Sequence, residues 1–127
     1  MRPDDPLAKK EYVMANELSV LPLILPNRFR VQSELANWFG EYYENLNVLF
    51  TSNLSSNASV IVSRGLAYAI VVEGLIPFWD QSQITYRPLY PYLAAPSVLT
   101  WKRGQPFGLA ATKFIDYIKC FLGINKA

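Results

Sequence analysis

A run of consecutive apolar residues at positions 66–72 follows directly on a helix-like stretch, with Gly65 between the two. Strands of parallel sheets are apolar at successive rather than alternate positions, because helices cover both of their faces. Glycine reaches positive φ without steric cost, so Gly65 can end a helix and let a strand begin at once. The pattern predicts a helix, a glycine turn and a buried strand through Val72, which is typical of α/β proteins.

Strand-like and helix-like segments alternate along the rest of the chain. Short apolar runs predict further strands at residues 21–25 and 97–102. Residues 47–50 and 84–89 are expected to form strands as well. Apolar positions at helical spacing predict helices at residues 31–43, from residue 58 to the glycine, and at residues 107–122. Residues 1–20 are polar with two prolines and are expected to form a connector in which Asn16 caps a single turn. We therefore expect an α/β fold with right-handed crossovers and a mostly parallel sheet.

Composition argues against several functions. The chain has 127 residues, enough for one domain, and its 12 basic and 10 acidic residues are too balanced to indicate a nucleic-acid surface. A single cysteine, Cys120, excludes an internal disulfide, and its place in an apolar helix predicts a buried, inert thiol. Histidine, the commonest general base and metal ligand, is absent. We expect no catalytic residues, no metal and no cofactor.

The cellular compartment is predicted from the absence of membrane-spanning and secretory segments in the sequence. No apolar run approaches the ~20 residues of a membrane-spanning helix. The first residues also lack the hydrophobic region of a signal peptide. We expect a soluble, cytoplasmic protein that does not contact a membrane.

Small molecules bind open α/β sheets beyond the carboxyl ends of strands, where loops lead into helix N-termini. Two predicted loops have this position. Residues 26–30 offer the guanidinium groups of Arg28 and Arg30, and residues 51–57 offer hydroxyls and amides without a full charge. The alternatives are a surface turn with two solvated arginines and a well-capped helix. Together the loops suit a small anionic or polar ligand.

Several segments, taken in order, resemble the C-terminal half of the effector-binding domain of LysR-type transcriptional regulators. They are DDPLAKK at 4–10, NEL at 16–18, LPLILP at 21–26, SRGLAYAIVVE at 63–73, YRPL at 86–89, VLTWKRG at 98–104 and AATKFI at 110–115. No single segment is specific, so the ordered set carries the resemblance.

The resemblance implies a fold like that of periplasmic binding proteins, with two subdomains. Residues 20–89 would form the complete second, Rossmann-like subdomain and residues 90–96 the hinge. Residues 97–127 would be the C-terminal strand and helix of the first subdomain, and residues 1–19 a connector from its missing part. Since the helix-turn-helix has no counterpart here, we expect a fragment of a regulator that contacts DNA only through that missing N-terminal domain.

The resemblance also implies a site. In the family, the two candidate loops line the effector cleft, which assigns ligand binding to Asn27, Arg28, Phe29, Arg30, Asn53, Leu54 and Ser55. One departure is Glu73, where the family commonly has proline, so ligand contact from the loop after that strand is not expected.

Two other functions are compatible with the pattern: a fragment of a solute-binding protein for small-molecule uptake, and an oligomerisation module without a working pocket. The strand at 97–102 and the helix at 107–122 would find no apolar partner within the chain. We therefore expect a homo-oligomer, a dimer or higher, joined through these C-terminal segments. The identity of the effector does not follow from the sequence.

Overall fold

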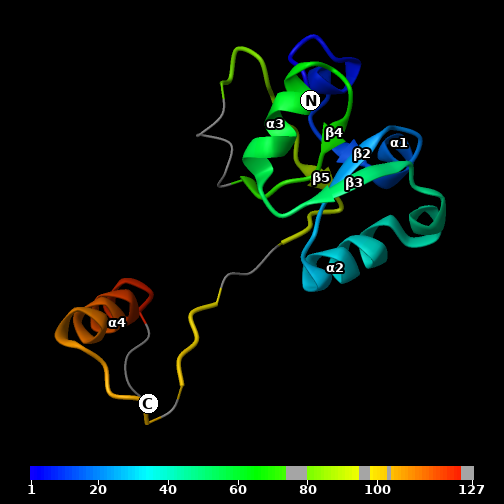
Figure 1. Cartoon of the computed structure of the whole chain (residues 1–127). Helices are drawn as coiled ribbons and strands as arrows, with labels where there is room; N and C mark the ends of the chain where they lie inside the picture. Colours follow the sequence, from blue (N-terminus) through cyan, green and yellow to red (C-terminus); the bar gives the residue numbers. More distant parts are fainter. Residues whose placement is uncertain (74–79, 95–97, 103, 124–127) are drawn as a thin grey trace. The chain divides into compact units, whose positions relative to one another are not determined.

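The computed structural model describes residues 1–73, 80–94, 98–102 and 104–123 (Figure 1). The chain divides into two compact units, Met1–Ala95 and Pro96–Ala127. Each unit has its own helices or strands and is described by itself below. The subdomain boundaries that the resemblance implies at residues 20–89 and 90–96 stay a prediction.

The main sheet of the first unit is parallel and has the strand order β3-β2-β4. Its strands are β2 (Leu23–Pro26), β3 (Val48–Ser52) and β4 (Tyr68–Ala69). Helix α2 (Phe29–Phe39), continued by the 3-10 helix η2 (Gly40–Asn45), connects β2 to β3, and α3 (Ser55–Ser63) connects β3 to β4. The alternation predicted for this part of the chain is confirmed.

The central strand explains the consecutive apolar pattern. Leu23, Ile24 and Leu25 of β2 are 0%, 2% and 4% exposed. Leu23 and Leu25 pack in one cluster with residues of α2, whereas Ile24 packs in a second cluster with residues of α3 and the start of β4. Successive side chains of a strand point to opposite faces, so helices on both faces require apolar residues at every position.

Gly65 has the conformation predicted for it, with φ of 72°. Its backbone N–H donates to the Val62 carbonyl at 2.9 Å, and Leu66 donates to the Ile61 carbonyl at 3.2 Å. These bonds satisfy carbonyls at the end of α3, as a glycine in the left-handed region commonly does. The chain then reaches β4 within three residues.

Residues 1–20 contain more structure than a polar connector. They form the 3-10 helix η1 (Pro6–Lys9), the strand β1 (Val13–Met14) and the one-turn helix α1 (Ala15–Leu18). Val13 and Leu18 are 1% and 4% exposed and belong to the main core cluster. Asn16 lies inside α1 and does not cap it, so that prediction was wrong; instead Glu17 accepts a hydrogen bond from the Met14 N–H at 3.0 Å.

Three predicted strands are shorter than expected or not formed. Of residues 66–72, only the two of β4 are paired as a strand, and Ile70 adds one bond to the Ile24 carbonyl at 3.1 Å. Of residues 84–89, only the last forms part of a strand, β5 (Leu89–Tyr90), which pairs in parallel with β1. Residues 98–102 form no strand, and Ser97 lies outside the described residues. An apolar run becomes a strand only where a neighbouring strand can pair with it.

The second unit contains helix α4 (Leu109–Phe121), close to the predicted helix. None of its residues is buried, and Phe114, Tyr117 and Phe121 are 55%, 66% and 74% exposed. Cys120 is exposed as well, so the expectation of a buried thiol was wrong. The reason is that the described part of the second unit contains no other helix or strand that could cover the apolar stripe of α4. Across the same part, no helix is both long enough and apolar enough to span a membrane.

Candidate functional site

The carboxyl ends of β2 and β3 lie side by side and carry the two candidate loops. Pro26 at the end of β2 is paired with Ser52 at the end of β3. The Asn27 N–H extends this pairing by donating to the Ser52 carbonyl at 3.0 Å. The loop that leads into α2 is therefore joined directly to the loop that leads into α3.

The first candidate loop is shorter than predicted. α2 begins at Phe29, with Arg28 as its N-cap, and the Gln32 N–H donates to the Arg28 carbonyl at 2.9 Å. Phe29 and Arg30 therefore lie in the first turn of the helix and not in the loop. The apolar pattern that begins at Val31 places the helix start too late, because a first turn needs no buried residue. No side chain of a described residue caps this turn, and its first backbone N–H groups have no partner within the helix.

The second candidate loop is reduced to Asn53 and Leu54. Thr51 and Ser52 belong to β3, and Ser55 is the first residue of α3. The Ser52 hydroxyl donates to the Leu54 carbonyl at 2.8 Å and accepts from the Leu54 N–H at 3.2 Å. Although this segment is rich in capping residues, Leu54 is the N-cap, and α3 has no side-chain cap from the residues that the structure describes. The alternative of a well-capped helix is therefore not what the structure has.

Exposure and charge complete the site. Asn27, Arg28, Phe29, Arg30, Asn53 and Leu54 are exposed, and Ser55 is half-buried. Ion pairs among the described residues join Arg2 to Asp4 and Lys10 to Glu17, and neither involves Arg28 or Arg30. The N-termini of α2 and α3 and the exposed Arg28 and Arg30 therefore lie at the carboxyl ends of β2 and β3. This arrangement favours an anion over a cation. It forms an open surface and not an enclosed pocket.

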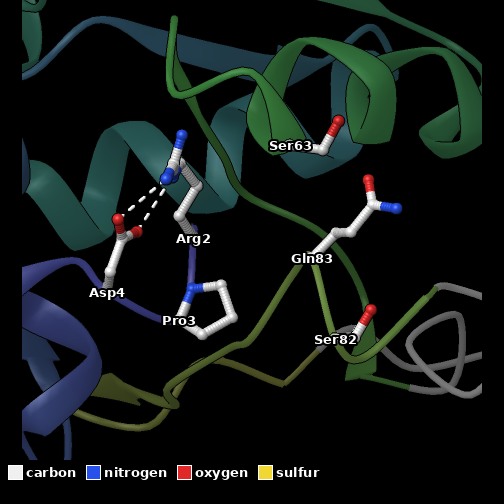
Figure 2. A pocket seen from close by; sticks show the side chains of 6 residues that line it. All are labelled: Arg2, Pro3, Asp4, Ser63, Ser82 and Gln83. Carbon is white, nitrogen blue, oxygen red and sulfur yellow. Dashed lines mark hydrogen bonds and ion pairs between the residues drawn. The ribbon is translucent and has the colours of Figure 1, made fainter.

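The described residues of the first unit form, among others, two cavities that none of the candidate site residues line. The smaller, of about 370 Å³, is lined by Arg2, Pro3, Asp4, Ser63, Ser82 and Gln83 (Figure 2). Arg2 points toward Asp4 and donates two hydrogen bonds to its carboxylate, each of 2.8 Å (Figure 2). These bonds hold the pKa of the Asp4 carboxyl below its usual value. Because Asp4 already neutralises the guanidinium, this cavity is a poor anion site.

The larger cavity, of about 570 Å³, is mainly apolar and borders Pro26 and Val31 near the first loop. Tyr68 lines it, and its hydroxyl donates to a carboxylate oxygen of Asp5. Burial, the hydrogen bond and the negative charge of Asp5 together raise the pKa of Tyr68 to about 12. Our sequence analysis did not single out Tyr68. The signal available was one hydroxyl inside the apolar run at 66–72, since a half-buried tyrosine usually finds a hydrogen-bond partner.

Metal ligands do not gather in the described part of the chain, where no group of three or more His, Cys, Asp and Glu side chains could hold an ion. Glu41 lies in η2 and Asp80 in a turn, where Asp80 accepts hydrogen bonds from Ser82 and Gln83. The bonds from Ser82 lower the pKa of the Asp80 carboxyl. Neither carboxylate belongs to the candidate loops.

Comparison with solved structures identifies the fold. The chain is similar to HinK, a LysR family transcriptional regulator from Pseudomonas aeruginosa, with a TM-score of 0.63 and 19% identity over 96% of this chain and 43% of that one. It is also similar to the PA01 protein from Pseudomonas aeruginosa, described as belonging to the same family, with a TM-score of 0.66 and 20% identity over 97% and 43%. The chain thus spans less than half the length of each. At this identity the likeness shows the fold, which is the periplasmic-binding-protein-like α/β fold that we expected.

Comparison at the level of sequence identifies the family. No curated protein matches the chain. Residues 1–122, nearly the whole chain, match the family model described as the LysR substrate binding domain. The resemblance noted in the sequence is therefore confirmed, and the chain belongs to the LysR substrate-binding domain family.

Proposed function

We propose that this chain is the effector-binding module of a LysR-type transcriptional regulator and that it binds a small anionic or polar molecule beside the N-termini of α2 and α3. The observation that supports the proposal is the hydrogen bond from Asn27 to the Ser52 carbonyl, which joins the two candidate loops. Family membership supports the module's role, and the uncapped helix ends support the class of ligand.

A carboxylate suits the site because its oxygens accept from guanidinium and backbone N–H groups at once. Arg28 and Arg30 offer planar donors, and hydrogen bonds to charged groups contribute about 1.5–3 kcal/mol each in favourable geometry. A helix N-terminus adds about 0.3–1 kcal/mol at an exposed position. Solvent screens all of these interactions at an open surface, so we expect dissociation constants on the order of millimolar for simple anions.

Other parts of the proposal follow from the family. Contact with DNA is assigned to a helix-turn-helix domain, and the even charge of this chain, with 12 basic and 10 acidic residues, suits a module that does not bind DNA itself. Such a regulator works in the cytoplasm and carries out no catalysis. The candidate residues include no histidine, cysteine or carboxylate, so they offer no general base of the usual kinds.

The test is a titration of the chain with acetate, succinate and sulfate, followed by calorimetry. Replacing Arg28 and Arg30 together by alanine is expected to weaken binding by about tenfold or more, since two charge-assisted contacts are lost. The matched control is Arg64→Ala, which removes an exposed arginine at the other end of α3. Equal binding by the double variant and the control would remove Arg28 and Arg30 from the site.

A further inference from the structure

The larger cavity of the first unit has the size and the lining of a small-molecule pocket. Its volume is about 570 Å³, and pockets for small ligands measure roughly 300–1,000 Å³. Buried apolar side chains form much of its wall, among them Val13, Leu18 and Leu35. Val72 and Tyr86 also line it and are exposed, so the cavity is open to solvent on their side. A ligand with an apolar body would lose contact with water by entering it, which favours binding.

Arg87 supplies a positive charge to this wall and is held in one orientation by hydrogen bonds. Its Nε donates to the Lys10 carbonyl and its Nη1 to the Tyr86 carbonyl, each at 2.6 Å. Nη1 also donates to the Thr85 hydroxyl at 3.5 Å, and Nη2 donates to the Ala8 carbonyl. All of these acceptors are neutral. They fix the direction of the guanidinium group without balancing its charge.

The guanidinium charge of Arg87 calls for an anion. The ion pairs among the described residues do not include Arg87, and its hydrogen bonds leave one Nη2 N–H without a partner there. The Tyr68 hydroxyl, another polar group of the wall, already donates to Asp5. Glu73 lines the cavity as well, but it is exposed, so solvent screens its negative charge. A carboxylate is the group that pairs best with a guanidinium.

We infer that the larger cavity binds a monocarboxylate with an extended apolar body, of the kind found in medium-chain fatty acids. The carboxylate accepts hydrogen bonds from Nη2 of Arg87 and from the Thr85 hydroxyl, and the hydrocarbon body lies against Leu35, Ile70 and Leu93. Sugars and dicarboxylates fit poorly, because the apolar wall would bury their further polar groups without partners. This site shares no residue with the anion site proposed at the N-termini of α2 and α3, so binding at one does not require binding at the other.

The first experiment compares octanoate, octanol and acetate by calorimetry on the 127-residue chain. Octanol has the same apolar body without the charge, and acetate has the charge without the body. We expect octanoate to bind at least about tenfold more tightly than either, because both of its parts find partners in the cavity. The inference is overturned if octanoate shows no saturable binding, or if it binds no more tightly than one of the other two probes.

The second experiment removes the charge with Arg87→Met, which keeps an unbranched apolar stem. Octanoate binding is expected to weaken by about tenfold or more while octanol binding stays the same, so the preference for the acid is lost. A purely structural role of Arg87 would weaken the binding of both probes alike and leave the preference intact. That result would overturn the inference. Far-ultraviolet circular dichroism checks that the variant is folded.

The third experiment fills the cavity and does not depend on the folding of the Arg87 variant. Leu93, which is half-buried, lines the cavity, and Leu93→Trp is expected to weaken octanoate binding by about tenfold or more. The matched control is Leu66→Trp, at a leucine that is 64% exposed and does not line the cavity. Equal octanoate binding by the two tryptophan variants would place the ligand elsewhere and overturn the inference.

Discussion

The Tyr68 hydroxyl donates a hydrogen bond to the Asp5 carboxylate, although the two residues are 63 positions apart in the chain. The other Asp5 oxygen accepts from the Leu7 N–H at 2.8 Å, at the start of η1. Asp5 therefore fastens the N-terminal segment to β4, at the wall of the larger cavity. This contact, together with the burial of Val13 and Leu18 in the main core cluster, holds residues 1–20 in the first unit.

Tyr68→Phe removes this contact and is expected to lower the free energy of unfolding by about 1 kcal/mol near neutral pH, the usual value for one hydrogen bond. The loss should depend on pH. The pKa of Tyr68 is raised from 10.0 to about 12 in the folded chain, so the contribution is complete below pH 10 and disappears as pH rises toward 12. Urea midpoints of both proteins, compared from pH 8 to pH 11, should move closer together as the pH rises above 10. A difference that stays constant over this range would mean that the folded state does not shift the Tyr68 pKa.

Gly65→Val is expected to destabilise the first unit by about 1–3 kcal/mol, because valine is strained at positive φ. The observed φ is 72°, and a Cβ atom at this position would lie 3.1 Å from Cδ of Arg2. Gly65→Asn is the control, since asparagine tolerates the left-handed region better than other residues. Thermal or denaturant unfolding should rank the wild type above Asn and Asn above Val. Equal midpoints for the two variants would contradict the role assigned to the turn.

Leu35→Ala is expected to cost about 2–5 kcal/mol, the range for deleting a buried leucine side chain. Leu35 is 0% exposed and packs with Leu23, Leu25 and Phe39 in the main core cluster. The matched control is Leu66→Ala, at a leucine that is 64% exposed, where a change within about 0.5 kcal/mol is expected. Similar losses for the two variants would mean that α2 does not pack on the sheet as described.

The sequence predicted those parts of the fold in which the conformation or burial of a residue restricts which amino acid can stand there. The consecutive apolar residues of β2 and the glycine after α3 could be interpreted from the sequence because burial on two faces and positive φ each demand particular residues. The pairing of Val13 with Leu89 could not be predicted from the sequence, because a two-residue strand is too short to show a periodic pattern of apolar residues. The strand predicted at residues 84–88 is not formed: Ile84 is buried, but the segment also contains Arg87 and Pro88.

The candidate site shows the same division. The two loops were expected to be adjacent because the carboxyl ends of parallel strands lie on the same side of a sheet. The hydrogen bond from the Asn27 N–H to the Ser52 carbonyl agrees with this expectation. The placement of Phe29, Arg30 and Ser55 in helices did not follow, because helix starts here lack a side-chain cap that would mark them. Ligand contact by any of these residues stays a prediction.

The most direct test of the proposed function is a two-dimensional amide NMR titration of the chain with acetate or succinate. Amide groups at helix N-termini shift when an anion binds, and each residue reports separately. We predict saturable shifts that are largest at residues 28–30 and 53–55, and that disappear when Arg28 and Arg30 are both replaced by alanine. Shifts that never saturate, or that are largest around Arg2 and Ser82 instead, would contradict the assignment of the effector site to the ends of β2 and β3.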